Sequence, residues 1–423
     1  MDRFVVRPNG PLDGTVAVHG AKNSVLKCMA ACLLAPGRHR IANVPAITDV
    51  SIMAEVLAAL GATAVHHGKG TEGVLEVDVP IDVTPVAPYE LVERIRASFV
   101  VLGPLLARHG WARISLPGGD DFGGRPVDMH LRGFQELGVT FRTEHGYVEG
   151  RCDRLRGTRI VLEFPSHTTT DNLLMAAVLA KGTTVIENAA REPEVSDLAA
   201  MLTGMGARIE GAGTSRIEIE GVEDLRPATH VAIPDRVEAA TFLAAVGLAG
   251  GEIQVERARA EHMDMLLEKL TAIGVHCTPN AGGIFAWSDG RLLSVDVATL
   301  PYPGVATDYK PFLVALLAVA SGVAIVSENI FAGRFRYIDE LIRMGAKITT
   351  EGHHAVVRGV PRLSGAPVRA SDLRAGAALV LAGLVAEGQT EVSGAEHVDR
   401  GYEDLSGRLA RLGADISRVR GDE

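Results

Sequence analysis

Apolar and polar positions along the chain follow two patterns, one typical of helices and one typical of strands. Stretches such as "KNSVLKCMAACLLA" (22–35) and "DMLLEKLTAIG" (264–274) place apolar residues at helical spacing. A glycine then follows, and after it a β-rich run such as "GRHRIANV" (37–44). Because glycine can end a helix without steric cost, this order predicts a helix, a glycine cap and a strand.

The pattern recurs along the chain. Six fragments combine a helix end, a glycine and a β-rich run: "ALGATAV", "ELGVTFR", "GMGARIE", "AIGVHCT", "RMGAKIT" and "RLGADIS". Their glycines lie 68–77 residues apart, at Gly61, Gly138, Gly206, Gly274, Gly345 and Gly413. A second glycine precedes each by 23–28 residues, at Gly37, Gly110, Gly182, Gly250, Gly322 and Gly388. Six α/β units of about 70 residues predict two globular domains of three units, since solenoids of such long units are uncommon.

Length and composition fit this organisation. A chain of 423 residues suits two domains of about 200 residues each. Hydrophobic residues at 47% and charged residues at 22% are ordinary for a globular protein. No apolar run is long enough to cross a bilayer, and "MDRFVVRPNG" lacks the apolar core of a signal peptide. We therefore expect a cytoplasmic protein with no membrane partner.

Charge and cysteine usage exclude other classes. A net charge of −10 and 4% aromatic residues argue against nucleic-acid binding. Four cysteines are too few for a disulfide framework in a chain of this size. Cys28 and Cys32 lie one helical turn apart, which indicates a buried helix face. A metal pair is the alternative, but no histidine or further cysteine lies nearby to complete it, so we expect no metal and no cofactor.

The segment "SLPGGDDFGGRPVDMH" (115–130) fits neither element. Its four glycines and two prolines predict a flexible loop. It carries two adjacent carboxylates, Asp120 and Asp121, and then a cation, Arg125. A phosphate-binding loop would use glycines and a cation but would avoid acids. The loop therefore indicates chemistry that needs an acid and a cation together.

This loop and several other motifs resemble the enolpyruvyl transferases, above all the branch that acts on UDP-N-acetylglucosamine. The motifs occur in order over nearly the whole chain: "GAKNSVLK", "RASFVVLGPLLARHG", "NAAREPEVSDL", "PDRVEAATFL", "ATDYKPF", "RASDLRAGAALVLAG" and "HVDRGYEDL". The resemblance implies an inverse α/β barrel fold with two domains, six repeats and an active site in the interdomain cleft. One domain would span residues 22–233 with the mobile loop 115–130, and the other residues 1–21 and 234–423.

The family transfers the enolpyruvyl group of phosphoenolpyruvate to an alcohol and releases phosphate. Addition followed by elimination requires cations for a phosphate and a carboxylate, a base for the alcohol and an acid for the methylene carbon. By the resemblance, the phosphate is bound by Lys22, Arg125 and Arg400, and the carboxylate by Arg334 and Arg374, with Asn23 beside them. Asp372 and Glu192 are expected to orient these cations.

The resemblance also assigns the acid and the base. Asp120 stands where most relatives carry a cysteine that delivers the proton, and where a minority carry aspartate. A dehydrated site beside an anionic substrate would raise its pKa, as a general acid requires. Asp121 is the competing candidate, although the register with "PGG" and "GRPVD" favours Asp120. Asp308 corresponds to the family's base, and it could also cap the helix that follows it, since the two roles are compatible. Lys22 is the third catalytic candidate.

The stretch "RPVDM" (125–129) resembles the family's uridine-binding segment. The implied acceptor is a uridine nucleotide, with the 3-hydroxyl of UDP-N-acetylglucosamine as the first choice and peptidoglycan precursor synthesis as the role. The expected nucleotide contacts are Asn23, Arg96, Arg125, Pro126, Val127, Asp128, Met129, Ser166, His167, Thr168, Asp308 and Ile330.

Three departures from the family pattern surround the acceptor. "SHTTT" (166–170) replaces Ser-Val-Gly-Ala-Thr, "FAGRF" lacks an acidic residue before its arginine, and "ATDYK" lacks the usual Pro and Gln. They leave open a relative from nucleoside-antibiotic biosynthesis whose acceptor is UMP. A non-catalytic nucleotide-binding relative is the third alternative, which the retained acid, base and cations disfavour. Aspartate in place of cysteine implies insensitivity to fosfomycin, which alkylates the thiol.

Overall fold

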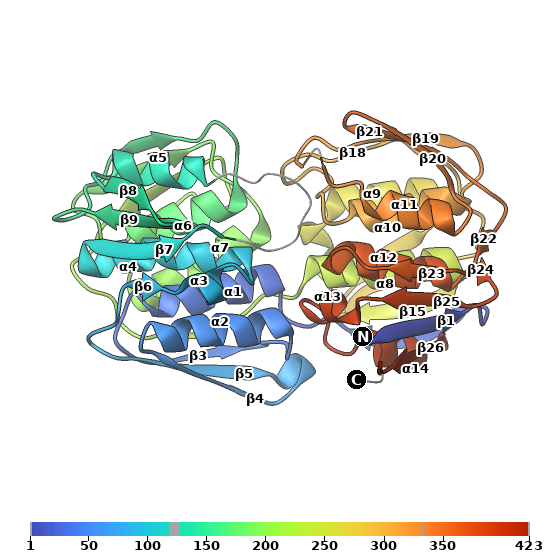
Figure 1. Ribbon diagram of the computed structural model, residues 1–423, viewed down its shortest axis with the longest axis horizontal. Helices are drawn as coiled ribbons and strands as arrows, with labels where there is room; N and C mark the ends of the chain where they lie inside the picture. Colours follow the sequence, from blue (N-terminus) through green and yellow to red (C-terminus); the bar gives the residue numbers. More distant parts are fainter. Residues whose placement is uncertain (1, 118–126, 332, 422–423) are drawn as a thin grey trace. The chain divides into compact units, whose positions relative to one another are not determined.

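The structure, a computed structural model, describes residues 2–117, 127–331 and 333–421. These residues form two compact units (Figure 1). The terminal unit joins residues 2–19 to the described residues from 234 onward, and the middle unit contains residues 20–117 and 127–233. Four residues with predicted roles lie outside the described residues: Asp120, Asp121, Arg125 and Pro126.

Small sheets form the framework of both units. The described residues contain six four-stranded sheets and one two-stranded sheet, and none of these closes into the predicted barrel. The six sheets share one order, in which an edge strand pairs in parallel with the second strand and two antiparallel strands follow. Each unit contains three of them. The fold is therefore mixed α/β with many small sheets.

The strands of the middle unit form three sheets. Their orders are β14 (Thr229–Val231), β3 (Gly37–Ala42), β5 (Val74–Val79), β4 (Thr63–His67); β6 (Val86–Ala87), β7 (Trp111–Ser115), β9 (Tyr147–Arg151), β8 (Thr140–Glu144); and β10 (Arg159–Val161), β11 (Thr183–Glu187), β13 (Arg216–Glu220), β12 (Arg208–Glu210).

The strands of the terminal unit follow the same scheme. Their orders are β2 (Leu12–Ala17), β15 (Gly251–Glu256), β17 (Gly283–Ser288), β16 (His276–Asn280); β18 (Val297–Ala298), β19 (Val323–Ser327), β21 (His354–Arg358), β20 (Lys347–Glu351); β23 (Pro367–Arg369), β25 (Thr390–Ser393), β1 (Arg3–Arg7), β26 (Asp415–Val419); and the pair β22 (Leu363–Ser364), β24 (Ala386–Glu387).

Helices fill the interior of each unit. The middle unit contains α1 (Lys22–Cys32), α2 (Thr48–Ala59), α3 (Tyr89–Val92), α4 (Leu102–His109), α5 (Asp128–Glu136), α6 (His167–Ala177) and α7 (Pro193–Met205), with 3-10 turns η1 (Gly70–Glu72) and η2 (Arg96–Val101). The terminal unit contains α8 (Arg236–Ala249), α9 (Asp264–Ile273), α10 (Lys310–Val319), α11 (Tyr337–Arg343), α12 (Leu373–Gly383), α13 (Ala395–Asp399) and α14 (Leu405–Arg411), with η3 (Ala260–His262).

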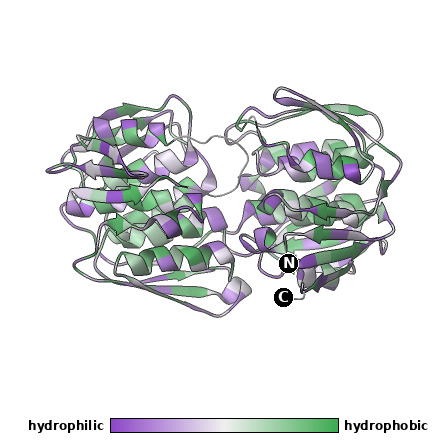
Figure 2. Cartoon of the chain, in the orientation of Figure 1, coloured by the Kyte–Doolittle hydropathy of each residue, from purple (hydrophilic) through white to green (hydrophobic). Residues whose placement is uncertain are grey.

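Two kinds of helix alternate. In α1, α6, α8, α10 and α12 nearly every residue is buried, and Figure 2 shows their hydrophobic colouring. In the terminal unit α8, α10 and α12 pack against one another. Helix α9, in contrast, buries only Leu266, Leu270 and Ile273, a single stripe. None of the helices among the described residues combines the length and apolar character needed to cross a bilayer.

The glycines predicted to end the helices have a backbone conformation that other residues rarely adopt. All twelve have a positive φ, between 67° and 120°. Gly110, Gly206 and Gly274 are the C-cap residues of α4, α7 and α9. A side chain would strain the backbone at these positions. The predicted helix ends are therefore confirmed at these three glycines, whereas α1, α6, α10 and α12 end earlier, at Leu33, Val178, Ala320 and Leu384.

Candidate active site

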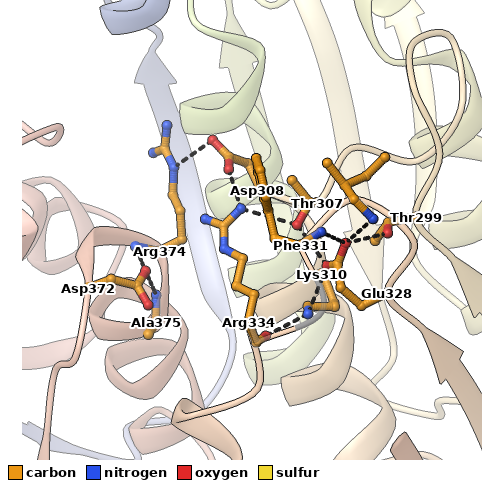
Figure 3. Close-up of polar contacts among 11 residues, drawn as sticks. Thr299, Thr307, Asp308, Lys310, Glu328, Phe331, Arg334, Asp372, Arg374 and Ala375 are labelled. Atoms are coloured by element: carbon orange, nitrogen blue, oxygen red, sulfur yellow. Dashed lines mark hydrogen bonds and ion pairs between the residues drawn. The ribbon is translucent and has the colours of Figure 1, made fainter. Parts of the chain in front are cut away.

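Asp308 is the centre of a charged cluster in the terminal unit. It lies two residues before the start of α10, and both Arg334 and Arg374 point toward it (Figure 3). The Oδ1 atom of Asp308 accepts a hydrogen bond from Arg334 at 2.7 Å. Its Oδ2 atom accepts one from Nε of Arg374 at 3.4 Å. The fold thus brings together three residues, from separate segments, that were predicted to share a site.

The arginines of this cluster are buried and the carboxylate is partly open. The side chains of Arg334 and Arg374 are 4% and 2% exposed, and that of Asp308 is 24% exposed. Burial alone would lower the pKa of Arg334, but the carboxylates of Asp308 and Asp372 outweigh it, so this pKa is raised. One guanidinium nitrogen of Arg374 is buried without a hydrogen-bond partner among the described residues. Because an unpaired buried donor is costly, it is well suited to bind an anionic ligand.

Asp308, which was also expected to cap the next helix, does not occupy the N-cap position of α10. The N-cap residue of α10 is Tyr309, which makes no side-chain cap. Asp372 is a cap instead, because it accepts hydrogen bonds from the backbone N–H groups of Arg374 at 2.9 Å and Ala375 at 3.0 Å. Asp372 therefore orients Arg374 through the start of α12.

The other predicted residues for phosphoenolpyruvate are spread over both units. Lys22 begins α1 in the middle unit, and its Nζ lies 2.6 Å from Oδ2 of the buried Asp49. Asn23 follows it and is half-buried. Arg400 is the C-cap residue of α13 in the terminal unit. Their roles stay predictions.

Several predicted nucleotide residues lie around a small hollow in the middle unit. Asp128 and Met129 begin α5 beside it, and Ser166 caps α6 by accepting a hydrogen bond from the backbone of Thr169 at 3.4 Å. The hollow is lined by the predicted residues Arg96, Val127 and Thr168, together with Phe99, Val100, Pro117 and His130.

His130 was not predicted, although it directly follows the "RPVDM" stretch. Burial lowers the pKa of His130 to about 3, and the charge of Arg96 adds to this effect, so the ring is neutral. Asn172 accepts a hydrogen bond from the backbone of Gly103 at 2.7 Å, so its amide nitrogen faces Nδ1 of His130 at 3.1 Å. The ring proton is then on Nε2, 3.4 Å from Oγ1 of Thr168. The hydroxyl hydrogen of Thr168 is thereby left for another acceptor.

A second unpredicted cluster joins Lys27, Asp171 and His167. The Nζ atom of Lys27 lies 3.3 Å from Oδ2 of Asp171 and 3.1 Å from Nε2 of His167. The side chains of Lys27 and Asp171 are buried. Burial raises the pKa of Asp171 to about 7, against the opposing effect of Lys27. A titratable group is therefore buried beside a predicted nucleotide residue.

Asp171 leads to a prediction on pH and stability. Because its pKa in the folded chain, about 7, exceeds the ordinary value of 3.8, its contribution to stability is complete below about pH 4 and is lost as the pH rises to about 7. Asp171→Asn removes this titration. We expect the unfolding free energy of the wild type, relative to Asp171→Asn, to fall between pH 4 and 7 and to level off above pH 7. Urea denaturation at constant ionic strength measures this, and a constant difference would contradict it.

The neighbourhood of Cys28 requires a correction. No histidine is near it in the sequence, but the fold brings ligand atoms of His230, Asp197 and Cys28 within 4.8 Å of one another. Asp197 accepts hydrogen bonds from Nε2 of His230 at 2.9 Å, from the backbone of Ile233 at 3.3 Å and from the hydroxyl of Ser24. Because these donors satisfy the carboxylate, the cluster is explained without a metal ion.

Comparisons with known proteins agree with this geometry. The family described as EPSP synthase (3-phosphoshikimate 1-carboxyvinyltransferase) matches residues 6–409. A UDP-N-acetylglucosamine 1-carboxyvinyltransferase from Anaeromyxobacter dehalogenans is 51% identical over 423 residues and covers all of both chains. One from Nocardia farcinica is 49% identical over 424 residues, again with full coverage of both chains.

Solved structures show the same similarity. The enolpyruvyl transferase NikO from Streptomyces tendae matches with a TM-score of 0.89 and 29% identity, covering 100% of this chain and 99% of that one. An EPSP synthase from Acinetobacter baumannii matches with a TM-score of 0.75 and 19% identity, covering 99% of this chain and 100% of that one. The second likeness shows the fold alone.

Proposed function

Because the chain belongs to the enolpyruvyl transferase family, we propose that it transfers the enolpyruvyl group of phosphoenolpyruvate to the 3-hydroxyl of UDP-N-acetylglucosamine. The observation that carries this proposal is the 51% identity, over the whole of both chains, to an enzyme named for that acceptor. The transfer would serve the synthesis of peptidoglycan precursors. The chain is an enolpyruvyl transferase in class, and the acceptor is the part that needs testing.

The cluster around Asp308 supports a mechanism. The hydroxyl oxygen of the acceptor attacks C2 of phosphoenolpyruvate while the methylene carbon takes a proton. Phosphate then leaves C2 while the new methyl group gives up a proton, and the double bond is restored. Asp308 removes the hydroxyl proton, and two adjacent cations favour the ionised carboxylate that this step needs. Arg334 and Arg374 hold the carboxylate of phosphoenolpyruvate. Their burial makes each charge-assisted contact stronger than it would be in water.

The remaining assignments rest on the family resemblance. Lys22, Arg125 and Arg400 hold the phosphate that leaves, and Asp120 gives the proton to the methylene carbon. The uridine nucleotide lies against the start of α5 and the start of α6. The hollow lined by Arg96, Val127 and Thr168 supports this placement, because it brings three of the proposed residues to one surface.

The finer description of the fold is part of the same proposal. Six repeats form two three-repeat domains, with boundaries near residues 21 and 233. The support is threefold: six sheets of one order, three of them in each compact unit, and twelve recurring glycines of positive φ. The two units divide at residues 19–20 and 233–234.

A phosphate-release screen tests the proposed acceptor. The protein is incubated with phosphoenolpyruvate and, in parallel, UDP-N-acetylglucosamine, UDP, UMP or uridine. We expect kcat/KM to be highest for UDP-N-acetylglucosamine, by about tenfold or more over UMP, because the sugar and second phosphate supply binding energy. Phosphate release with UMP but not with UDP-N-acetylglucosamine would favour the nucleoside-antibiotic alternative. No release with any acceptor would favour a non-catalytic protein.

A further inference from the structure

We propose that the buried ion pair of Lys310 and Glu328 positions Arg334 against Asp308. The inference rests on the proposed function, in which Arg334 holds the carboxylate of phosphoenolpyruvate and Asp308 is the base. Lys310 and Glu328 act through Arg334 and Thr307, so they are positioning residues. Figure 3 shows Glu328 and Lys310 beside Thr307, on the far side of Arg334 from Arg374.

The pair is fully buried. The Nζ atom of Lys310 lies 2.8 Å from Oε2 of Glu328, and both side chains are 0% exposed. Burial lowers the pKa of Lys310 to about 8, although Glu328 opposes the change. The ammonium group also lies 3.9 Å from the ring centroid of Phe335. Because a single buried charge is costly, each member of the pair requires the other.

The pair fixes the backbone around Arg334. Lys310 donates a hydrogen bond from Nζ to the backbone carbonyl of Arg334 at 2.5 Å. Glu328 accepts hydrogen bonds at Oε1 from the backbone N–H groups of Ile330 at 2.8 Å and Phe331 at 3.0 Å. The chain is therefore held both at Arg334 and at the residues that lead to it.

The pair also fixes the guanidinium group, through Thr307. The hydroxyl of Thr307 lies 2.7 Å from Oε2 of Glu328, and because a carboxylate only accepts, the hydroxyl is the donor. Its oxygen is then free to accept a hydrogen bond from Nη1 of Arg334, at 3.2 Å. The same Nη1 atom lies 2.7 Å from Asp308. Glu328 thus determines where the nitrogen that contacts Asp308 is placed.

A second buried pair in the terminal unit provides the matched control. Glu238 and Arg408 are 3% and 4% exposed, and they contact each other directly. Their partners are His19 and the backbone carbonyl of Ala17, which belong to a different part of the unit from Arg334. Breaking either pair should destabilise the fold, but only one pair leads to Arg334.

The test compares Glu328→Gln with Glu238→Gln. We expect Glu328→Gln to raise KM for phosphoenolpyruvate roughly 10- to 100-fold, as when an outer partner of a functional group is removed. KM for the uridine nucleotide should change less than about twofold, because that ligand uses other residues. Glu238→Gln should lower the melting temperature without changing either KM. In the Arg334→Ala background, Glu328→Gln should raise KM for phosphoenolpyruvate by less than about a further twofold, because Glu328 acts through Arg334.

Failure of the proposed site and failure of the positioning inference give different experimental results. An unchanged KM for phosphoenolpyruvate in Arg334→Ala would refute the proposed site, and the positioning would then be judged from a crystal structure of Glu328→Gln. That structure should show Arg334 out of hydrogen-bond distance of Asp308, and an unmoved Arg334 would overturn the inference. Fully additive effects of Glu328→Gln and Arg334→Ala would overturn it as well. If Glu328→Gln does not fold, the double variant Lys310→Met, Glu328→Gln is used in its place, because it leaves no unpaired buried charge. The same rise in KM for phosphoenolpyruvate is expected.

Discussion

Asp308→Asn is expected to lose most of its turnover, on the order of 10²- to 10⁴-fold in kcat, which is the range for loss of a general base. Asparagine keeps the shape of the side chain but cannot take up the hydroxyl proton. It also removes the charge that faces Arg334 and Arg374, at 2.7 and 3.4 Å. Because two buried arginines then lack their carboxylate, the melting temperature should fall as well. Steady-state phosphate release and thermal unfolding measure the two effects.

Asp404→Asn is the matched control for this variant. Asp404 lies in the same unit, and its side chain caps α14 by accepting a hydrogen bond from the backbone of Gly407 at 3.0 Å. Asparagine is as good a cap as aspartate, so this variant should keep normal turnover. An Asp308→Asn protein with near-normal kcat would show that the carboxylate serves only to pair the two arginines.

The ends of the helices could be predicted from the sequence because their cause is local. A helix that turns into a strand within two or three residues needs a positive φ, and glycine adopts it at least cost. Gly206 and Gly274 illustrate this, with φ of 112° and 115°. The family resemblance was also predictable, because its motifs extend over the whole chain, and the comparisons confirmed it over the same length.

The burial of the helices was less predictable. The sequence suggested helices with one apolar face, but α12 is buried on all sides and includes Arg374. From the sequence alone, a charged residue in an apolar helix is predicted to face solvent. Lys27 in α1 and Lys310 in α10 are both buried, because Asp171 and Glu328 from other segments pair with them. Such pairs are a property of the fold, and nothing in the local pattern of residues indicates them.

The residues of the candidate site show the same contrast between what the sequence indicates and what only the fold brings together. Residue types and motifs nominated Asp308, Arg334 and Arg374, and the structure brings these three into contact. The support around them was missed, because Glu328 and Thr307 carry no signal of their own in the sequence. His130 was missed for a similar reason: its partners Asn172 and Thr168 are about 40 residues away in the chain. The sequence therefore indicated the charged groups and, with Asp372, one residue that orients them, but it did not indicate the buried support beside Arg334.

The proton donor is the second residue whose loss should be severe, and it lies outside the described residues. We expect Asp120→Ala to lose kcat by about 10²- to 10⁴-fold, because the methylene carbon then has no acid to protonate it. Asp121→Ala is the matched control, since it removes the neighbouring carboxylate of the same loop and should change turnover less than about threefold. Phosphate release under saturating substrates measures both variants.

Fosfomycin provides an independent test of the same residue. A thiolate attacks an epoxide readily, whereas a carboxylate is a weak nucleophile and a protonated carboxyl group is weaker still. The wild-type protein should therefore turn over in fosfomycin without time-dependent inactivation. Asp120→Cys should keep activity and gain one covalent adduct, visible by intact mass, because it places a thiol where the acid was. An adduct on the wild-type protein would show that Asp120 is not the proton donor. An active Asp120→Ala beside an inactive Asp121→Ala would show the same.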